Sequence, residues 1–449
     1  MSPLHLGVTE TPSIKEVVCY GLQQAMICMS GLLVHPFIIS HAACAGAAAV
    51  QLRVQLISAT FISCGIATIL QTTFGLRLSV LHGPAMAFLP PLLAYKQNNH
   101  CSYSDYDTVP EQFWKSRITK KGQMVSTRIR LFGQFPYLLS ILLVWLVCFI
   151  MTIFDWEPFN GAARTDNNVT MMVLRESPWF HVPMPLTYGT PTISAGIVFG
   201  YMASCIASII ENIGSYDLLA RTSHQTPPPP DAINRAITIE GVGSMLAAIN
   251  GVSSGVTTYA ENIALIHITK VASRATMQFA GVVLILLGLF SKFAAILASI
   301  PDALVGGVLV MGVSMIGGVA LSNLQMIDLK ICRNLSIMGL SLLLGMIIPI
   351  HFEKHPVNTT IPDLNHILNM LLNIKMLVGG VIATFLDNTV PGATRHQRGF
   401  RKPADMADTD YNSDAYDFPH SLQRLLKQYP SLQNVPILPK LLSNKVQRV

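Results

Sequence analysis

Long apolar stretches separated by short polar loops recur along most of this 449-residue chain. An α-helix crosses the hydrocarbon core of a bilayer with about 20 mainly apolar residues, and we predict about eleven such segments, two of them short. They lie near Val17–Val34, Leu52–Thr73, Ser79–Tyr95, Leu131–Phe154, Thr187–Ile213, Ala236–Asn250, Thr257–Ile268, Ala275–Phe290, Ala303–Leu321, Leu335–Ile350 and Ile367–Leu386. The pattern predicts an all-α polytopic membrane protein, because a helix satisfies its own backbone polar groups in lipid.

Two of these segments are interrupted in a way that a plain membrane helix is not. Gly83 and Pro84 break one segment, and residues 250–261 are rich in Gly, Ser and Thr before a short apolar stretch. Each is the third segment of its half if the second half begins near Thr187. Broken segments at matching positions of two halves indicate the binding site of an inverted-repeat transporter. A half-helix beginning near Pro84 or Tyr259 would direct its N–H groups at a polar substrate, with ordinary loops as the alternative.

Two carboxylates stand in or beside apolar stretches. Glu211 directly follows the uncharged run over residues 193–210, and Glu261 stands in a stretch that ends at Thr269. An ionised side chain at the centre of a bilayer costs roughly 2.5–3.5 kcal/mol on insertion scales, so by default it marks a substrate or ion site. The pair therefore indicates a transporter. The alternatives are a solvated Glu211 beside Arg221 and a Glu261 in an exposed loop.

The composition fits a membrane protein and does not indicate nucleic-acid binding. Hydrophobic residues make up 51% of the chain and charged residues 12%, about half the charged share of a soluble protein. The net charge of +6 comes from Lys and Arg in alternate short loops, which the positive-inside rule places in the cytoplasm. The intervening loops 155–186 and 351–364 are more acidic and hold sequons at Asn168 and Asn358, so we predict glycosylated extracellular loops. The prolines of residues 227–230 predict an extended, non-helical connector.

The sequence does not indicate enzyme or metal chemistry. The eight cysteines have no Cys-x-x-Cys spacing and mostly lie in apolar segments, so we interpret them as reduced core residues and predict no metal site. Motifs of zinc proteases, serine hydrolases and phosphate-binding loops are missing, so we expect no enzyme, no cofactor and no ATP-driven transport. We interpret the histidines as packing residues and set His82 apart, because it precedes the interruption at Gly83.

Several stretches resemble the nucleobase–ascorbate transporters (nucleobase:cation symporter-2), and within them the sodium-dependent vitamin C transporter branch of animals. The signature of that family resembles Glu261-Asn262 followed by Thr269-Lys270. The other matching stretches cover nearly the whole chain and lie at residues 21–24, 71–77, 209–214, 227–235, 321–325 and 385–392. Together these motifs are highly specific.

The resemblance implies fourteen transmembrane segments in two inverted repeats of seven, with a core domain that carries substrate past a gate domain in an elevator motion. It implies that Glu211 and Glu261 bind a nucleobase or a related small polar heterocycle. A pair of carboxylates suits the urea-like N–H edge of a nucleobase. A homodimer in the plasma membrane is also implied. The further site residues implied are Tyr259, Ala260, Asn262, Met86, Ala87 and Gln24.

Four positions depart from the family pattern. Gln24 replaces a His of the first segment, which removes a titratable group, and Ala264 replaces a Gly. Ser215 stands where the vitamin C branch has an Asp that helps to hold sodium, so the coupling ion at Gln24 and Ser215 stays open between Na+ and H+. Glu261 stands where ascorbate carriers have Pro, and an ionised Glu would repel anionic ascorbate. We therefore favour a nucleobase carrier, with a sodium-coupled L-ascorbate transporter as the alternative.

The first half of the chain is shorter than the resemblance requires. Residues 96–130 are too polar to span a bilayer, yet they stand where the family has three further segments. The charge bias needs Tyr95 outside and Arg130 inside, so an odd number of crossings is missing. We interpret the sequence as a skipped-exon isoform or an incomplete gene model. A truncated, non-transporting isoform that associates with a full-length carrier is the second alternative.

The expected organisation has five parts in chain order. They are a cytoplasmic N-terminal tail (1–16), an incomplete first repeat (17–154), an extracellular loop (155–186), a second repeat of seven segments (187–387) and a cytoplasmic C-terminal tail (388–449).

Overall fold

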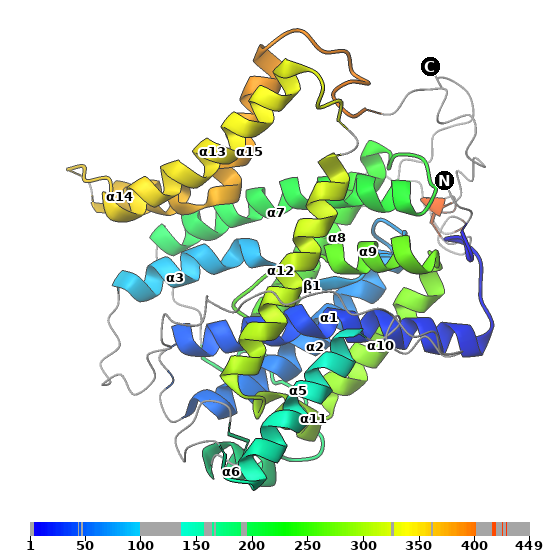
Figure 1. Cartoon of the computed structure of the whole chain (residues 1–449), viewed down its shortest axis with the longest axis vertical. Coiled ribbons are helices and arrows are strands. Elements are labelled where there is room, and N and C mark those ends of the chain that lie inside the picture. Colours follow the sequence, from blue (N-terminus) through cyan, green and yellow to red (C-terminus); the bar gives the residue numbers. More distant parts are fainter. Residues whose placement is uncertain are drawn as a thin grey trace.

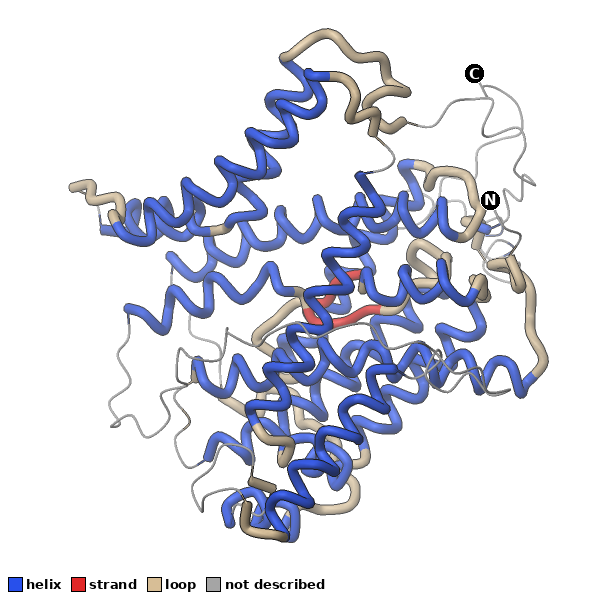
Figure 2. Tube along the Cα trace, in the orientation of Figure 1, coloured by secondary structure: helices blue, strands red, loops and turns tan. Residues whose placement is uncertain are grey.

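The protein, seen here as a computed structural model, is a bundle of helices around a very short two-stranded sheet (Figure 1). The structure describes residues 4–43, 45, 48–98, 136–156, 164–165, 168–189, 195–324, 327–360, 362–400, 415–418, 424 and 428. Figure 2 shows the two strands near the middle of the molecule, among the helices.

The described helices and strands occur in the same order as the predicted segments. They are α1 (Ile14–Ala42), α2 (Ala49–Thr73), β1 (His82–Pro84), the 3-10 helix η2 (Met86–Phe88), α3 (Leu89–Asn98), α5 (Pro136–Ile153), α6 (Asn168–Glu176), α7 (Ala195–Thr222), α8 (Pro230–Ile249), β2 (Val256–Thr258), α9 (Ala260–Thr269), α10 (Arg274–Leu289), α11 (Ser291–Ala298), α12 (Asp302–Leu324), α13 (Cys332–Lys354), α14 (Pro362–Asn373) and α15 (Lys375–Thr389).

The helices nearest the sheet form the main hydrophobic core. α1, α2, α8, α9 and α10 pack on one another and enclose one large cluster of buried side chains, among them Phe61 and Met277. α2 and α10 share the most extensive contact, and glycines bring their backbones together. A β-carbon on Gly65 would lie 2.6 Å from the carbonyl oxygen of Gly281. Small residues at such contacts let helices associate in lipid, where apolar burial alone gives little drive.

α13, α14 and α15 form a second group, and they reach the rest of the molecule mainly through α7 (Figure 1). α13 and α15 approach closely, since a β-carbon on Gly345 would lie 2.9 Å from the Cα of Gly379. α14 and α15 are bent by 76° at the break between them. The long faces of α13 and α15 expose large apolar side chains, including Leu343, Met346 and Phe385. These faces suit contact with lipid or protein.

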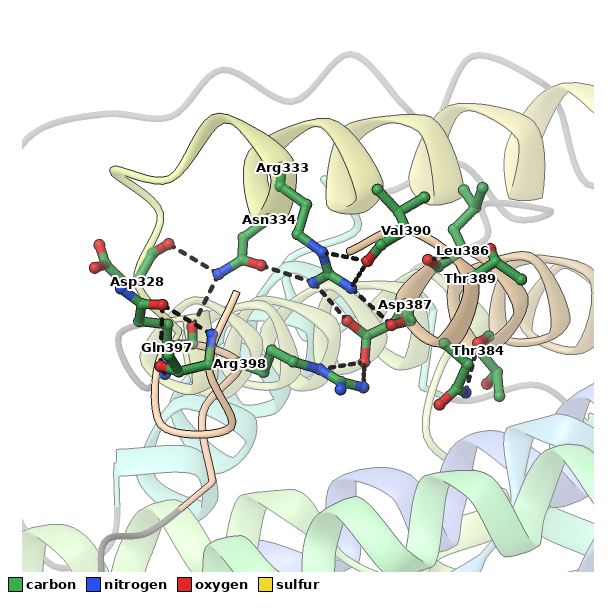
Figure 3. Close-up of polar contacts among 12 residues, drawn as sticks. Asp328, Arg333, Asn334, Thr384, Leu386, Asp387, Thr389, Val390, Gln397 and Arg398 are labelled. Atoms are coloured by element: carbon green, nitrogen blue, oxygen red, sulfur yellow. Dashed lines mark hydrogen bonds and ion pairs between the residues drawn. The ribbon is translucent and has the colours of Figure 1, made fainter. Parts of the chain in front are cut away.

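One end of this group is held by the Asp387 cluster, which consists of Arg333, Asp387, Val390 and Arg398 (Figure 3). Arg333 donates to one carboxylate oxygen of Asp387 at 2.8 Å and to the carbonyl oxygen of Val390 at 2.8 Å. Arg398 forms an ion pair with the other carboxylate oxygen of Asp387. The chain that follows α15 is thereby folded back onto the start of α13.

The prediction of a multi-pass membrane protein is confirmed at the level of helix length and composition. α1, α2, α13 and most of α7 are long and apolar enough to cross a bilayer, and α14 with α15 would add a fifth crossing if the bent pair is one span. The two predicted interruptions are confirmed as well, because they contain β1 and β2. The repeat boundaries and the domain organisation stay predictions.

Two details of the prediction are wrong. The chain is not all-α, because β1 and β2 pair. Pro230 is the first residue of α8, where a helix does not need the N–H group that proline lacks. Asn168 is the first residue of the short helix α6, within the predicted extracellular connection 155–186, and Asn358 is exposed in the loop after α13, so glycosylation of both stays a prediction. The predicted polar insert over residues 96–130 lies outside the described residues from residue 99 onward.

Candidate functional site

Two three-residue strands form the centre of the candidate site. β1 and β2 are antiparallel and buried throughout, with His82 opposite Thr258. Each strand of a two-stranded sheet has N–H groups that point away from its partner, and such groups are costly in a membrane interior unless another acceptor is found.

Side-chain oxygens from three neighbouring helices complete the strands. Thr68 of α2, Asn212 of α7 and Ser244 of α8 each accept one of the outward N–H groups at 3.0–3.1 Å. The donors are the N–H groups of His82, Thr258 and Val256, respectively. The site is therefore fixed by α2, α7 and α8 as much as by the strands themselves.

A half-helix leaves each strand, in opposite directions. η2 and α3 follow β1, and α9 follows β2 with Tyr259 as its N-cap. Both direct their positively polarised N-terminal ends towards the sheet, an arrangement that favours polar or anionic groups nearby. The Tyr259 ring lies against the backbones of Gly31 in α1 and Gly83 in β1, where a β-carbon on either glycine would overlap it.

Gln24 and Asn262 join α1 to α9. The Asn262 amide donates to the side-chain oxygen of Gln24 at 2.6 Å and to its carbonyl oxygen at 3.2 Å. Both residues are buried. The Asn262 side-chain oxygen and the Gln23 side-chain nitrogen, both buried, have no hydrogen-bond partner among the described residues. One acceptor, on Asn262, therefore stays open in the first turn of α9.

The two carboxylates singled out by the sequence lie close together. Glu261 is buried in the first turn of α9, and Glu211 is partly buried in α7. The charge of Glu211 interacts with those of Glu261 and Glu240. Within the described chain, no side chain forms a hydrogen bond or ion pair with the carboxylate of Glu211 or Glu261. Their oxygens are open to a ligand.

Some of the remaining predicted site residues lie next to the carboxylates and others do not. Ala260 is the first residue of α9 and adjoins Glu261. Ala87 is buried against α7, but Met86 is 39% exposed and lies at the edge of the site. The Ser215 hydroxyl donates to the carbonyl oxygen of Glu211 at 3.0 Å, within its own helix, and its role in ion coupling stays a prediction. The described His, Cys, Asp and Glu residues include no group of three or more that could hold a metal.

A buried network around Glu240 was missed by sequence reasoning. The Glu240 carboxylate in α8 accepts from the Tyr216 hydroxyl at 2.9 Å, and it lies 3.0 Å from the Nε2 atom of His82. Gln71 donates to the Tyr216 hydroxyl at 3.3 Å. The signal for Glu240 was present, because it is a lone carboxylate inside the predicted segment Ala236–Asn250. The separate treatment of His82 is supported by this contact.

Comparison with known proteins identifies the family to which the chain belongs. The permease family Xan_ur_permease matches residues 15–110 and 120–354. The chain belongs to this nucleobase–ascorbate permease family. The predicted family is thereby confirmed, and the protein is a multi-pass membrane transporter by membership.

Relatives of this permease are found in animals and plants. Solute carrier family 23 member 2 of Homo sapiens is 32% identical, over 96% of this chain and 82% of its own length. Solute carrier family 23 member 1 of Mus musculus is 29% identical, over 96% of this chain and 88% of its own. Nucleobase-ascorbate transporter 7 of Arabidopsis thaliana is 31% identical, over 68% of this chain and 59% of its own.

The alignment with the human relative shows how this permease differs from it in length. The alignment is 537 residues long and takes in 96% of a 449-residue chain. The relative therefore has on the order of 100 residues without a counterpart here, enough for about three membrane helices with their loops. The family match is also interrupted between residues 110 and 120, inside the predicted polar insert.

Proposed function

We propose that this permease is a secondary carrier that binds a nucleobase, or a related small polar heterocycle, between Glu211 and Glu261. The observation that carries the proposal is the pair of carboxylates, on α7 and α9, with no side-chain partner among the described residues. A carboxylate accepts on both oxygens, and a nucleobase edge offers N–H donors in one plane. Hydrogen bonds to ionised acceptors are roughly twice as strong as neutral ones.

An open polar atom in α9 supports the same class of substrate. The Asn262 side-chain oxygen is an unpaired buried acceptor next to Glu261, so a ligand that offers N–H donors would satisfy it. Ascorbate is an anion, and two neighbouring carboxylates oppose its binding. Sodium-coupled L-ascorbate transport is therefore the alternative, in which a cation would have to offset this repulsion.

For the coupling ion we propose H+ rather than Na+. Glu240 and His82 form a buried contact in which a proton can be held between an imidazole nitrogen and a carboxylate oxygen. The hydroxyl of Ser215 is engaged by its own helix, and Gln24 is engaged by Asn262. The proposal therefore rests on the Glu240–His82 contact, and Na+ coupling at Ser215 and Gln24 is the alternative.

For the transport cycle we propose an elevator motion in a plasma-membrane homodimer. The sheet, both half-helices and the carboxylates would move together with the main core, against α13–α15. The exposed apolar faces of α13 and α15 support a partner or lipid on that side.

Uptake of labelled uracil, urate and ascorbate, with and without sodium and at two external pH values, tests the proposal. We expect saturable nucleobase uptake that is stimulated by acid pH. Glu261→Gln and Glu211→Gln should each lower it at least tenfold, because a hydrogen bond to a charged group contributes about 1.5–3 kcal/mol. Glu353→Gln, at an exposed position near the end of α13, is the matched control and should leave uptake unchanged. Sodium-dependent ascorbate uptake would favour the alternative, and uptake that Glu261→Gln leaves intact would refute the site.

The residues that this chain lacks relative to its relatives support a second candidate function. A chain without those residues could associate with a full-length carrier and alter its trafficking without transporting anything itself. Differently tagged copies of this chain and of a full-length relative should then co-purify from cells that express both. Failure to co-purify, together with measurable uptake by this chain alone, would exclude this candidate.

A further inference from the structure

A four-residue stretch well beyond α15 packs against the main core. Ala415, Tyr416 and Phe418 are 0%, 5% and 5% exposed, and Ala415 and Tyr416 belong to the main hydrophobic cluster. We call Ala415–Phe418 the tail segment. It lies beside the beginnings of α8 and α10, on the face that the charge pattern predicts to be cytoplasmic. Burial of this degree is unusual for a polar C-terminal tail.

Two arginines hold the backbone of the tail segment. Arg235, in the second turn of α8, donates to the carbonyl oxygen of Tyr416 at 2.7 Å. Arg274, the first residue of α10, donates to the carbonyl oxygen of Ala415 at 3.0 Å. Such contacts recognise an extended backbone whatever its side chains, so they provide affinity more than specificity.

Specificity comes from the aromatic side chains. The Tyr416 hydroxyl donates to the carbonyl oxygen of Thr226 at 2.6 Å, in the connector between α7 and α8. The Phe418 ring lies under the Arg235 guanidinium, 4.5 Å from ring centre to carbon. A cation above an aromatic face is attracted by the negative charge of the ring face, so this contact favours an aromatic side chain at position 418.

The same arginines also hold the loop that leads into β1. Arg235 donates to the carbonyl oxygen of Gly75 at 2.7 Å, and Arg274 donates to that of Arg77 at 2.8 Å. The tail segment and this loop therefore share their anchors.

The positive charges around the tail segment favour an acidic residue at this position. Burial, and then the neighbouring Arg274 and Arg235, lower the pKa of Arg77 to about 10, while Asp417 acts in the opposite direction. Two nitrogens of the buried Arg77 guanidinium have no hydrogen-bond partner among the described residues. Three arginines gathered in this way repel one another unless an acidic group lies beside them, and Asp417 supplies one.

We propose that Arg77, Arg235, Arg274 and Thr226 form a peptide-binding site for a short segment in which two aromatic residues flank a carboxylate, and that the chain's own tail segment occupies it. The occupant is held by main-chain carbonyls and two rings of Ala415–Phe418, and the charge of the exposed Asp417 side chain opposes the effect of the neighbouring arginines on Arg77. Because the occupant is tethered, it acts at an effective concentration that can reach the millimolar range. A free peptide of the same sequence therefore binds when the tethered copy is weakened.

The test uses the full-length protein in detergent and a fluorescent peptide of residues 411–421. Fluorescence anisotropy should show little binding to the wild type, whose site is filled. The variant Tyr416→Ala with Phe418→Ala should bind the peptide at least tenfold more tightly. Adding Arg235→Gln and Arg274→Gln to that variant should abolish the binding.

Two controls keep the result unambiguous. A peptide that carries the same two alanine substitutions should bind none of the proteins. Tyr416→Phe, which removes only the hydrogen bond to Thr226, should give intermediate binding and serves if the double variant does not fold. Equal binding to wild type and tail variant, binding that survives loss of both arginines, or binding to no tail variant would each overturn the proposal. The readout does not involve transport, so it is independent of the substrate proposed above.

Discussion

The region around the central sheet and the α13–α15 group are both built from apolar helices, but they use polar side chains in opposite ways. Around β1 and β2, polar side chains such as Thr68, Asn212 and Ser244 are directed inwards and complete the backbone of another element. In α13–α15, polar contacts gather at the two ends, in the Asp387 cluster (Figure 3) and where Asn365 and Asn369 accept from the loop between α13 and α14, and the long faces between these ends are apolar and exposed.

The difference shows what defines each region. Directional bonds and close glycine contacts allow one arrangement of the sheet region, and a shift of any element leaves a buried donor without an acceptor. The α13–α15 group is fixed internally by a few contacts and depends on its surroundings to cover its faces. Substitutions should therefore have much larger effects in the first region than in the second.

Gly83→Ala should have the largest effect. The new β-carbon would overlap the Tyr259 ring, which is already enclosed by Gly31, so neither side can give way. We expect the free energy of unfolding to fall by about 3 kcal/mol, the upper part of the range for overpacking. Thermal unfolding followed by size-exclusion chromatography measures it. Gly214→Ala in α7 is the control, because a β-carbon there meets no other atom within 4 Å, and an equal loss in both variants would contradict the comparison.

Asn212→Ala should have the next largest effect. Its side-chain oxygen accepts from the Thr258 N–H and from the Thr257 hydroxyl at 2.9 Å, and alanine leaves both donors buried and unpaired. A loss of about 1–3 kcal/mol is expected from the same melting experiment. Ser314→Ala in α12 removes an exposed hydroxyl that bonds within its own helix and should change stability by less than about 0.5 kcal/mol. Indistinguishable variants would show that the strands are not held as described.

Asp387→Asn should have the smallest effect of the three. The Asp387 side chain is 36% exposed, so water and salt screen its ion pairs with Arg333 and Arg398. We expect a loss of about 1 kcal/mol or less, which shrinks further in high salt. Thermal melting at low and high ionic strength measures both effects. A loss as large as that of Asn212→Ala would mean that another part of the assembly covers the Asp387 cluster.

The carboxylates of the candidate site could be found from the sequence because an isolated charge in an apolar run is visible without knowledge of the fold. Glu211 and Glu261 were identified in this way, and Glu240 shows the same signal inside a predicted helix. The partners of Glu240 could not be foreseen. His82 and Tyr216 reach it from distant parts of the chain, and only the packing of α7, α8 and β1 brings them together.

The breaks in the helices could also be predicted, from Gly83, Pro84 and the Gly/Ser-rich run before Tyr259. The strands that these breaks contain could not. Strands of three residues are too short to show an alternating pattern. Their pairing depends on register, and the enclosure of the Tyr259 ring depends on that register together with Gly31. The prolines before α8 were misjudged at Pro230, because a proline that ends a connector can equally begin a helix.

The hydrogen bonds of Asn212 hold α7 and β2 together, so that the two elements are expected to move as one rigid unit. A hydrogen bond weakens steeply once it is bent, so α7 cannot slide along β2 without breaking two of them. The opposite side of α7 meets α15 through apolar atoms, where a β-carbon on Gly380 would lie 3.6 Å from the Ile210 side chain. Contacts of that kind have no preferred direction and lose little in a small lateral shift. Apart from the hydrogen bond from Arg221 to the carbonyl oxygen of Gly399 at 2.9 Å, a small lateral shift between α7 and α15 would therefore cost less than one between α7 and β2, and both carboxylates lie on the helices joined to β2.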